Sequence, residues 1–579
     1  MTALHPAFAP LDGPTLVQAS AGTGKTYTIT TYFVRGIIER GLTPDQILVV
    51  TYTKAATADL RKRARERIVE AIERLDGPLQ KPDLLDELLP PIVERLGRDV
   101  VERRLRNALA NMDQAAILTI HGFCQRLLQD HPLAFGIDFD FEVSEDLSSM
   151  YTELATDFWS SELYAKPKWF VHALGERRVD TELLAKLADY ATSPRVALHG
   201  AAPVHVDHSL VEHALEARRA ARDLWLEHRD EVKQILLEDE GLDRRRYGTK
   251  SVRKWFPNLD SFAQQDGLQQ LPEHFEKLAQ GRMYLRATGE EPQHPFFQAC
   301  AEVLAANEAL APMLDYAVFE FQKRFLDVAE EDVRRRRRET GVLSFDDLLT
   351  VVHDRIVGDA SAAATVADAY PLALVDEFQD TDPLQYAIFR AAYGSGSCVY
   401  VGDPKQAIYA FRGADVYSYI TATSDVGERE WTLDTNRRSD PSMVDAVNRL
   451  YERPDAAFIV EGIDFEPVHA HEALDRSNLK PALDFVWIDE ERLRGRGSPL
   501  AEIAASEVAT LLQSNARIDG RPIEPSDIAV LCRSNAKARD VTKALRALNV
   551  PTSLEGDSSV LSTDVARAMR AVLEAALLP

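Results

Sequence analysis

The sequence predicts an α/β protein whose principal domain is built on a parallel sheet. Three observations lead to this prediction: a glycine-rich strand–loop–helix segment near the N-terminus, apolar runs that end in polar residues, and helical periodicity between those runs. Runs that are apolar on both faces are typical of parallel strands covered by helices on each side. The functional loops of such a sheet follow the carboxyl ends of its strands.

Residues 16–26 form a candidate phosphate-binding loop, in which a strand end is followed by small residues and then by a helix that opens with Lys25-Thr26. Glycines let backbone N–H groups turn toward a polyphosphate, and the helix N-terminus adds positive partial charge. Lys25 would reach the β- and γ-phosphates, and the Thr26 hydroxyl would bind Mg²⁺. The spacing is that of G-x-x-x-x-G-K-[ST], whereas a flexible loop before an ordinary helix would predict no Lys-Thr pair. The residues expected to bind ATP here are Ala19 (in place of the first glycine), Ser20, Ala21, Gly22, Thr23, Gly24, Lys25 and Thr26.

Four further apolar runs predict strands, at residues 47–50, 117–120, 372–375 and 398–401. The third run leads directly into Asp376 and Glu377. We expect Asp376 to hold the Mg²⁺ shell and Glu377 to orient or deprotonate an attacking water. A pair of surface carboxylates capping a strand is the alternative, and the four apolar residues directly before the pair count against it.

Two changes of character divide the chain. Residues 144–340 show helical periodicity without strand signals, which predicts a helical subdomain inserted into a first domain formed by residues 1–143 and 341–440. Basic runs at 244–254 and 334–338 are by default solvated helix faces, and a wall that contacts phosphates is the alternative. From residue 441 to 579 we expect the beginning of a second α/β domain. Its signals are strands at 484–488 and 527–532 and helices at 498–514 (with Ser498 as N-cap) and 537–548.

Composition restricts the class of protein. Neither a run of about 20 apolar residues nor a signal peptide is visible, so we expect no membrane contact. The four cysteines lie far apart without C-x-x-C spacing, which argues against disulfides and zinc and fits the cytoplasm. A net charge of −25 means that nucleic acid would have to be held by a local groove and by base stacking.

Several motifs resemble those of the superfamily-one DNA helicases of the UvrD/Rep type, namely DEFQDTD at 376–382 and GDPKQAIYAFRGA at 402–414. Four more are similar to the exonuclease V beta-subunit (RecB-like) family within that group: ASAGTGKT at 19–26, VTYTKAAT at 50–57, TIHGFC at 119–124 and GVLSFDDL at 341–348. The resemblance begins at residue 16 and weakens after about 468. It implies two RecA-like domains that hydrolyse ATP with Mg²⁺.

The resemblance also implies roles for single residues. Gln406 matches a glutamine that senses the γ-phosphate, and Arg438 matches an arginine that touches it, so the catalytic set is Lys25, Glu377, Gln406 and Arg438. Arg437 stands where an aromatic residue usually stacks on adenine, and a guanidinium can also stack on a base. Contacts to single-stranded DNA are implied for Tyr52, Thr53, His121, Tyr409, Phe411 and Arg412. Core packing is the alternative for Tyr409 and Phe411.

A member of this family would act as a 3′–5′ motor on single-stranded DNA and duplex ends, beside the gamma and alpha subunits of exonuclease V in double-strand-break repair. Two later helicase motifs, resembling T-I-H-K-S-K-G-L-E and A-L-T-R-A, and a nuclease domain are not found in these 579 residues. An arginine supplied across a phosphoryl-transfer site changes rate by ~10³–10⁵. We therefore expect nucleotide binding with weak or no unwinding by this chain alone.

Two other interpretations stay open. One is an AddA-type helicase–nuclease or a plain UvrD/Rep-type helicase, although the GTGK loop and TIHGFC motif favour the beta-subunit family. The other is a nucleotide-gated DNA-binding module without turnover. The presence of all first-domain groups for hydrolysis counts against that module.

Overall fold

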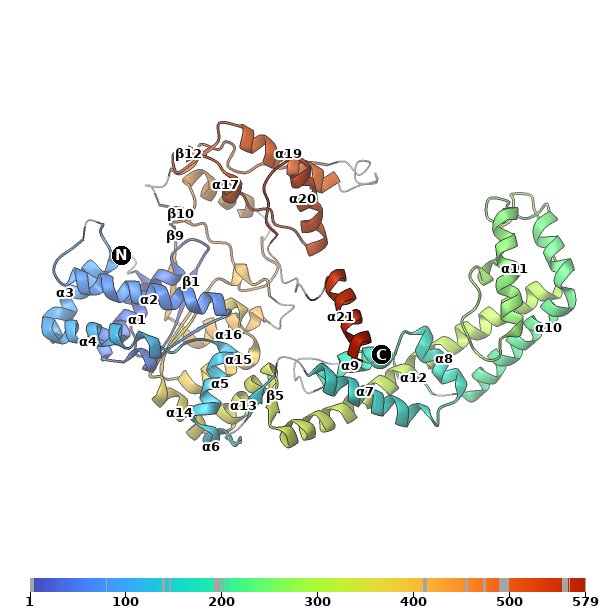
Figure 1. Ribbon diagram of the computed structural model, residues 1–579, viewed down its shortest axis with the longest axis horizontal. Helices are drawn as coiled ribbons and strands as arrows, with labels where there is room; N and C mark the ends of the chain where they lie inside the picture. The colour runs from blue at the N-terminus through green and yellow to red at the C-terminus, as the bar shows by residue number, and fades with distance from the viewer. Residues whose placement is uncertain are drawn as a thin grey trace. The chain divides into compact units, whose positions relative to one another are not determined.

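The computed structural model describes residues 5–79, 81–137, 141–144, 147–191, 199–200, 202–205, 207–409, 414–452, 457–471, 475–488, 499–554, 561 and 563–577. The chain divides into two compact units, one of Met1–Phe123 with Arg355–Pro579 and one of Cys124–Asp354 (Figure 1). The helical insertion predicted for residues 144–340 falls inside the second unit. The predicted domain limits themselves stay predictions.

The first unit contains a six-stranded parallel sheet in the order β3-β2-β6-β7-β1-β8. Its strands are β1 (Pro14–Ala19), β2 (Ile47–Thr51), β3 (Ile117–Thr119), β6 (Leu372–Val375), β7 (Ser397–Gly402) and β8 (Glu430–Leu433). The α/β fold class is therefore confirmed, and five of the six strands coincide with the predicted apolar runs. Strand β8 was not predicted, because it is an edge strand in which only Leu433 is fully buried.

Helices cover both faces of this sheet. On one face, side chains such as Leu374 and Val399 share a core with four helices. These are α1 (Lys25–Arg40), α2 (Lys54–Arg74), α3 (Leu84–Leu96) and α4 (Arg98–Ala110). On the other face, the Tyr400 ring lies 4.6 Å from the Phe378 ring and 6.0 Å from that of Tyr386 in α15 (Pro383–Tyr393). With both faces covered, polar groups of the sheet are accessible at its edges and strand ends.

The register of the strands gathers several loops at the carboxyl edge of the sheet. Val50 of β2 lies opposite Val375 of β6, and the Asp376 N–H donates to the Val50 carbonyl oxygen at 2.8 Å. Strand β1 runs between β7 and β8, with Gln18 opposite Gly402 and Ala19 opposite Leu433. The candidate phosphate-binding loop therefore starts between the ends of β7 and β8.

The second unit is helical. Between residues 144 and 340 the described helices are α7 (Ser148–Leu163), α8 (Lys168–Glu176), α9 (Thr181–Tyr190), α10 (His208–Glu238), α11 (Thr249–Gln264) and α12 (Pro295–Thr340). Its core is rich in aromatic side chains, among which Trp225 and Phe296 are fully buried. The short strands β4 (Glu142–Val143) and β5 (Val342–Leu343) pair in parallel. No helix in the described part of either unit is long and apolar enough to cross a bilayer.

The strands predicted at 484–488 and 527–532 are wrong, because the structure has irregular backbone at 484–488 and 528–532. The Phe485 and Leu531 side chains are 73% and 95% exposed, since the described residues provide no neighbouring strand or covering helix for them. The predicted helices do form, as α19 (Pro499–Gln513) and α20 (Asn535–Ala547), and they share a small core. The predicted cap Ser498 lies outside the described residues.

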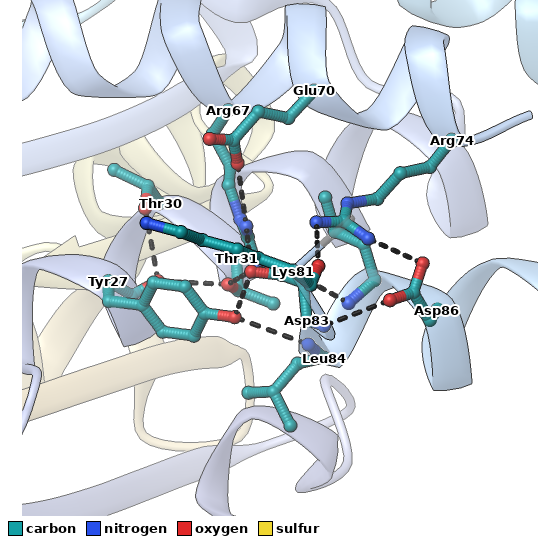
Figure 2. A network of polar contacts seen from close by, with 11 residues as sticks. Tyr27, Thr30, Thr31, Arg67, Glu70, Arg74, Lys81, Asp83, Leu84 and Asp86 are labelled. Carbon is teal, nitrogen blue, oxygen red and sulfur yellow. Dashed lines mark hydrogen bonds and ion pairs between the residues drawn. The ribbon is translucent and has the colours of Figure 1, made fainter. Parts of the chain in front are cut away.

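A polar network directly after the loop fixes α1 against its neighbours (Figure 2). The Tyr27 hydroxyl donates to the Asp83 carboxylate at 2.6 Å, and the Arg67 guanidinium lies 4.2 Å from the centre of the Tyr27 ring. Arg67 is buried and donates to Asp83, to Glu70 and to the Thr31 hydroxyl. Burial alone would raise the pKa of Asp83, but hydrogen bonds from Arg67 and Tyr27 outweigh it and hold that pKa below its usual value. The network thus joins α1, α2 and the N-terminus of α3.

Arg67→Ala is expected to lower the free energy of unfolding by about 3–5 kcal/mol at pH 7, because it leaves a largely buried carboxylate without its partner. Since Asp83 has a depressed pKa when folded, this loss is present above pH 4 and shrinks as the pH falls through the folded pKa. Urea denaturation followed by circular dichroism measures both effects. Arg63→Ala is the matched control on the same helix, because its exposed pair with Asp59 is worth at most about 1 kcal/mol. Equal losses in the two variants would contradict this account.

Candidate nucleotide and DNA site

The segment at residues 436–438, which follows β8, lies against the phosphate-binding loop. The Arg437 N–H donates to the Gly22 carbonyl oxygen at 2.8 Å, and Gly22 has a φ of 81°. A Cβ at position 22 would lie 2.7 Å from the Cβ of Arg438 and 2.8 Å from Asn436 Oδ1, so only glycine fits there. Ala19 is the last residue of β1 and is fully buried in the sheet. An alanine is therefore tolerated where the loop pattern has its first glycine.

The loop lysine is paired with the predicted base. Lys25 Nζ lies 2.6 Å from Glu377 Oε2, and the two side chains are 13% and 36% exposed. Glu377 adopts left-handed backbone angles, with φ 49° and ψ 44°, which are uncommon for a residue with a side chain. Thr26 follows Lys25 in the first turn of α1. The end of β6 and the start of α1 therefore converge on one point.

Carboxylates are in excess around Lys25. Burial and then the charge of Glu377 raise the pKa of Asp376 to about 7, against the opposing charge of Lys25. Burial and Glu377 also raise the pKa of Asp380 to about 6. In addition, Asp380 Oδ1 is buried and has no hydrogen-bond partner among the described residues. Three acidic side chains lie around one lysine, so a bound cation would offset the excess of negative charge at this site.

A chain of hydrogen bonds leads from Glu377 to Gln406. Gln379 donates to Glu377 Oε2 at 2.9 Å and accepts from the Asp403 N–H at 2.9 Å. Asp403 in turn accepts from the Gln406 side-chain amide at 2.7 Å. A Cβ at position 402 would lie 2.7 Å from Gln379 Oε1, so Gly402 permits the close approach. The predicted sensor is thus linked to the predicted base through two buried side chains.

Asn436 holds the segment that closes the loop. Its amide donates to the Ala21 carbonyl oxygen at 2.9 Å, and its Oδ1 accepts from the N–H groups of Arg438 and Ser439. Arg437 and Arg438 are both exposed. The positive charge of Arg437, after burial, helps to lower the pKa of His5, which places Arg437 near the N-terminal segment.

A cavity of about 410 Å³ connects the loop with the predicted sensors. Ser20, Ala21, Gln406 and Arg438 line its polar side. Its apolar side includes Met443, Val444, Val447, Tyr451, Phe458, Phe465 and Val468. Neither Lys25 nor Asp376 is among the residues that line this cavity. Lys25 is linked to Gln406 on its wall through the hydrogen-bond chain described above.

The predicted DNA contacts lie at the ends of β2, β3 and β7. Tyr52 and Tyr409 stack with ring centroids 5.4 Å apart and an angle of 23° between the rings. Thr53 caps α2 by accepting the Ala56 N–H at 3.1 Å, and His121 lies in the first turn of α5 (Ile120–Asp130). The structure therefore brings Tyr52 and Tyr409 together, and both side chains are only partly buried. Phe411 and Arg412 lie outside the described residues.

Sequence reasoning missed Gln379, Asp380, Asp403, Lys405 and Asn436 as parts of the site. Asp403 could have been found, because it follows a buried strand directly, as Asp376 does. Lys405 could not, since only the fold shows its Nζ 2.9 Å from Asp403 Oδ1 in a largely buried pair.

Asn436→Ala is expected to weaken nucleotide binding about tenfold, because it removes one hydrogen bond to Ala21 in the loop and two that order the 437–439 segment, each worth about 0.5–1.5 kcal/mol. Titration with a fluorescent ATP analogue measures the change. The control is Thr435→Ala, whose hydroxyl bonds only to the adjacent, exposed Asp434 among the contacts described. Unchanged nucleotide affinity in Asn436→Ala would show that the segment does not shape the loop.

Comparison with known proteins gives the family. Residues 2–427 match the UvrD/REP helicase N-terminal domain. The chain is 34% identical, over its whole length, to the RecBCD enzyme subunit RecB of Escherichia coli (strain K12). It is 30% identical to the RecB subunit of Haemophilus influenzae over 99% of its length, and 28% identical to that of Mycolicibacterium smegmatis over 98%.

The matched part amounts to 51%, 52% and 42% of these three relatives, so the chain spans about half their length. The likeness to UvrD/Rep-type and RecB-like proteins that the motifs indicated is confirmed. With a single family match that extends over most of the residues and a parallel sheet carrying the loop, this chain belongs to the UvrD/REP helicase family.

Proposed function

We propose that this chain is the ATP-hydrolysing motor portion of a RecB-type DNA helicase, the beta subunit of an exonuclease V. The observation that carries the proposal is the continuous polar connection from Lys25 through Glu377, Gln379 and Asp403 to Gln406. It links a phosphate-binding loop to a residue at the end of β7 that borders a cavity. Such a connection lets a bound triphosphate change the loops on either side of it.

Mg²⁺ fits the chemistry of this site. Hard oxygen ligands are what this ion prefers, and the Thr26 hydroxyl and the Asp376 carboxylate are of that type. The surplus of acidic groups and the unpartnered Asp380 Oδ1 favour a divalent cation as well. When bound with ATP, the ion neutralises charge on the phosphates during transfer.

The Lys25–Glu377 pair supports a simple order of events. Without nucleotide, Lys25 neutralises Glu377. A triphosphate in the loop competes for the ammonium group, because the triphosphate carries several negative charges and the carboxylate carries one. Release of Glu377 leaves it free to accept a proton from water. Arg438, which borders the cavity, would then contact the γ-phosphate, and Arg437 would lie near the base.

DNA binding rests on the stacked pair of Tyr52 and Tyr409. Aromatic side chains hold single-stranded bases by stacking, which is tolerant of sequence and worth ~1–3 kcal/mol per base. A base would separate the two rings or extend their stack, with Thr53 and His121 facing the sugar–phosphate backbone. This mode suits a chain with a net charge of −25, since it needs no extended basic surface.

The broader role follows the RecB relatives. We infer 3′–5′ movement on single-stranded DNA, entry at duplex ends, assembly with gamma and alpha subunits, and action in double-strand-break repair in the cytoplasm. These relatives favour a beta subunit over the AddA-type interpretation. The binding module without turnover is separated from the motor by the following experiment.

Lys25→Ala is expected to abolish nucleotide binding, whereas Glu377→Gln keeps nucleotide affinity and lowers kcat by about 10²-fold or more, as for loss of a general base. The measurement is phosphate release with and without single-stranded DNA, together with ATP-analogue binding. Lys62→Ala, at an exposed position of α2, is the control and keeps wild-type activity. Equal phosphate release from all four proteins would leave only the module without turnover.

A further inference from the structure

The second unit contains a pocket that the proposed motor does not use. Its volume is about 600 Å³, within the range of pockets that hold small ligands. Residues of α8, α10 and α12 and the segment around 268–276 line it. About half of the lining residues are apolar, with leucines at 268, 271, 304, 310 and 314, and the other half are polar or charged.

Arg218 is the unusual residue of this pocket. It is only 4% exposed, and it donates to the Gln269 carbonyl oxygen at 2.5 Å and to Asn307 Oδ1 at 3.3 Å. Its Nε is buried and has no hydrogen-bond partner among the described residues, a feature that it shares with Nε of Arg67 and Arg337. Both bonds are to neutral oxygens, so nothing in the described residues cancels the charge by direct pairing.

Comparison with the other buried arginines shows how unusual this is. Four arginines are buried among the described residues, and three of them are paired with a carboxylate. The pairs are Arg35 with Glu39, Arg67 with Asp83, and Arg337 with Asp347. Arg218 forms no ion pair within the described part of the chain. Burial lowers the pKa of Arg218 to about 10, even though the charge of Glu176 acts in the opposite direction.

A buried positive charge without a counter-ion destabilises a fold, and a bound anion that pairs with it removes this cost. Two features of the pocket restrict which anion can pair with Arg218. The leucine side of the lining favours an aliphatic body. Glu176, Glu273 and Glu276 on the lining oppose a polyanion such as DNA or a nucleotide, and of the lining cations besides Arg218, Arg177 is already paired with Asp315 and His274 is the other. A single carboxylate meets both constraints.

We propose that this pocket binds an aliphatic ligand with one carboxylate, which pairs with Arg218 while the aliphatic part packs on the leucine-rich walls. Asn307 lines the same pocket, and its side-chain amide can donate to the second carboxylate oxygen. A free aliphatic acid and an acidic residue in a leucine-rich peptide both present this chemistry. The site is independent of the proposed motor function, because all of its residues belong to the second unit.

The test uses the 579-residue chain with five probes in calorimetric or ligand-observed NMR titrations. Hexanoate and acetyl-Leu-Leu-Glu-Leu-amide carry the carboxylate, and 1-hexanol and acetyl-Leu-Leu-Gln-Leu-amide are their neutral counterparts. Inorganic phosphate is the fifth. At least one carboxylate probe is expected to bind, about 10- to 100-fold tighter than its neutral counterpart, as for loss of a charged hydrogen bond. Tighter binding of the peptide identifies a polypeptide ligand, and tighter binding of hexanoate identifies a free acid.

Arg218→Met should remove this preference without lowering the unfolding temperature, because it deletes a charge that the fold leaves unpaired. Arg219→Met, the exposed neighbour on the same helix, keeps wild-type binding. Arg337→Met should lower the unfolding temperature, because the largely buried carboxylate of Asp347 loses its cationic partner. Ala311→Trp fills the pocket with Arg218 intact and should also abolish binding.

Three results would overturn the proposal. The first is that neither carboxylate probe binds better than its neutral counterpart. The second is equal binding to the wild type, Arg218→Met and Ala311→Trp. The third is an unfolding temperature that falls as far in Arg218→Met as in Arg337→Met, which would make Arg218 a purely structural residue.

Discussion

The ion pair between Lys25 and Glu377 is the interaction on which the nucleotide site depends. It joins the first helix after the loop to the end of β6, two places that are far apart in the sequence and meet only through the parallel sheet. Because Glu377 also accepts from Gln379, any movement of Lys25 changes the charge that Gln379 and Asp403 experience. The hydrogen-bond chain to Gln406 passes through the Gln379 side chain and through the backbone N–H and carboxylate of Asp403, and both of these residues are buried.

The groups around Lys25 carry more negative than positive charge. Asp376, Glu377 and Asp380 lie around one ammonium group, and two of the three carboxyls have raised pKa values as a result of burial and mutual repulsion. A site with surplus negative charge attracts a metal ion, and a metal ion with a triphosphate restores the balance in a different geometry. The site therefore has two charge arrangements, one with Lys25 paired to Glu377 and one with a metal ion and a triphosphate bound. Nucleotide binding would change the first arrangement into the second.

The sequence predicted those features that depend on local pattern. Buried strands, the glycine loop and the acidic pair after 372–375 are all encoded in a few adjacent residues, and the structure has them where they were expected. Pairings across the sheet could not be read in this way. The bonds of Gln379 to Asp403 and of Asn436 to Ala21 depend on the strand order, which places β6 beside β7 and β1 beside β8. The two strands expected after residue 480 failed for the same reason, since apolar residues become a strand only where a neighbour is available.

Coupling between nucleotide binding and DNA binding tests the central claim most directly. Gln379→Leu is the informative variant, because it removes the hydrogen bonds that join Glu377 to Asp403. Affinity for a single-stranded oligonucleotide is measured with and without a non-hydrolysable ATP analogue, for wild type and variant. The account predicts that the analogue changes the DNA affinity of the wild type by about fivefold or more, which is a typical coupling. In Gln379→Leu both ligands still bind, but the analogue leaves the DNA affinity unchanged. An equal change in the two proteins would contradict it.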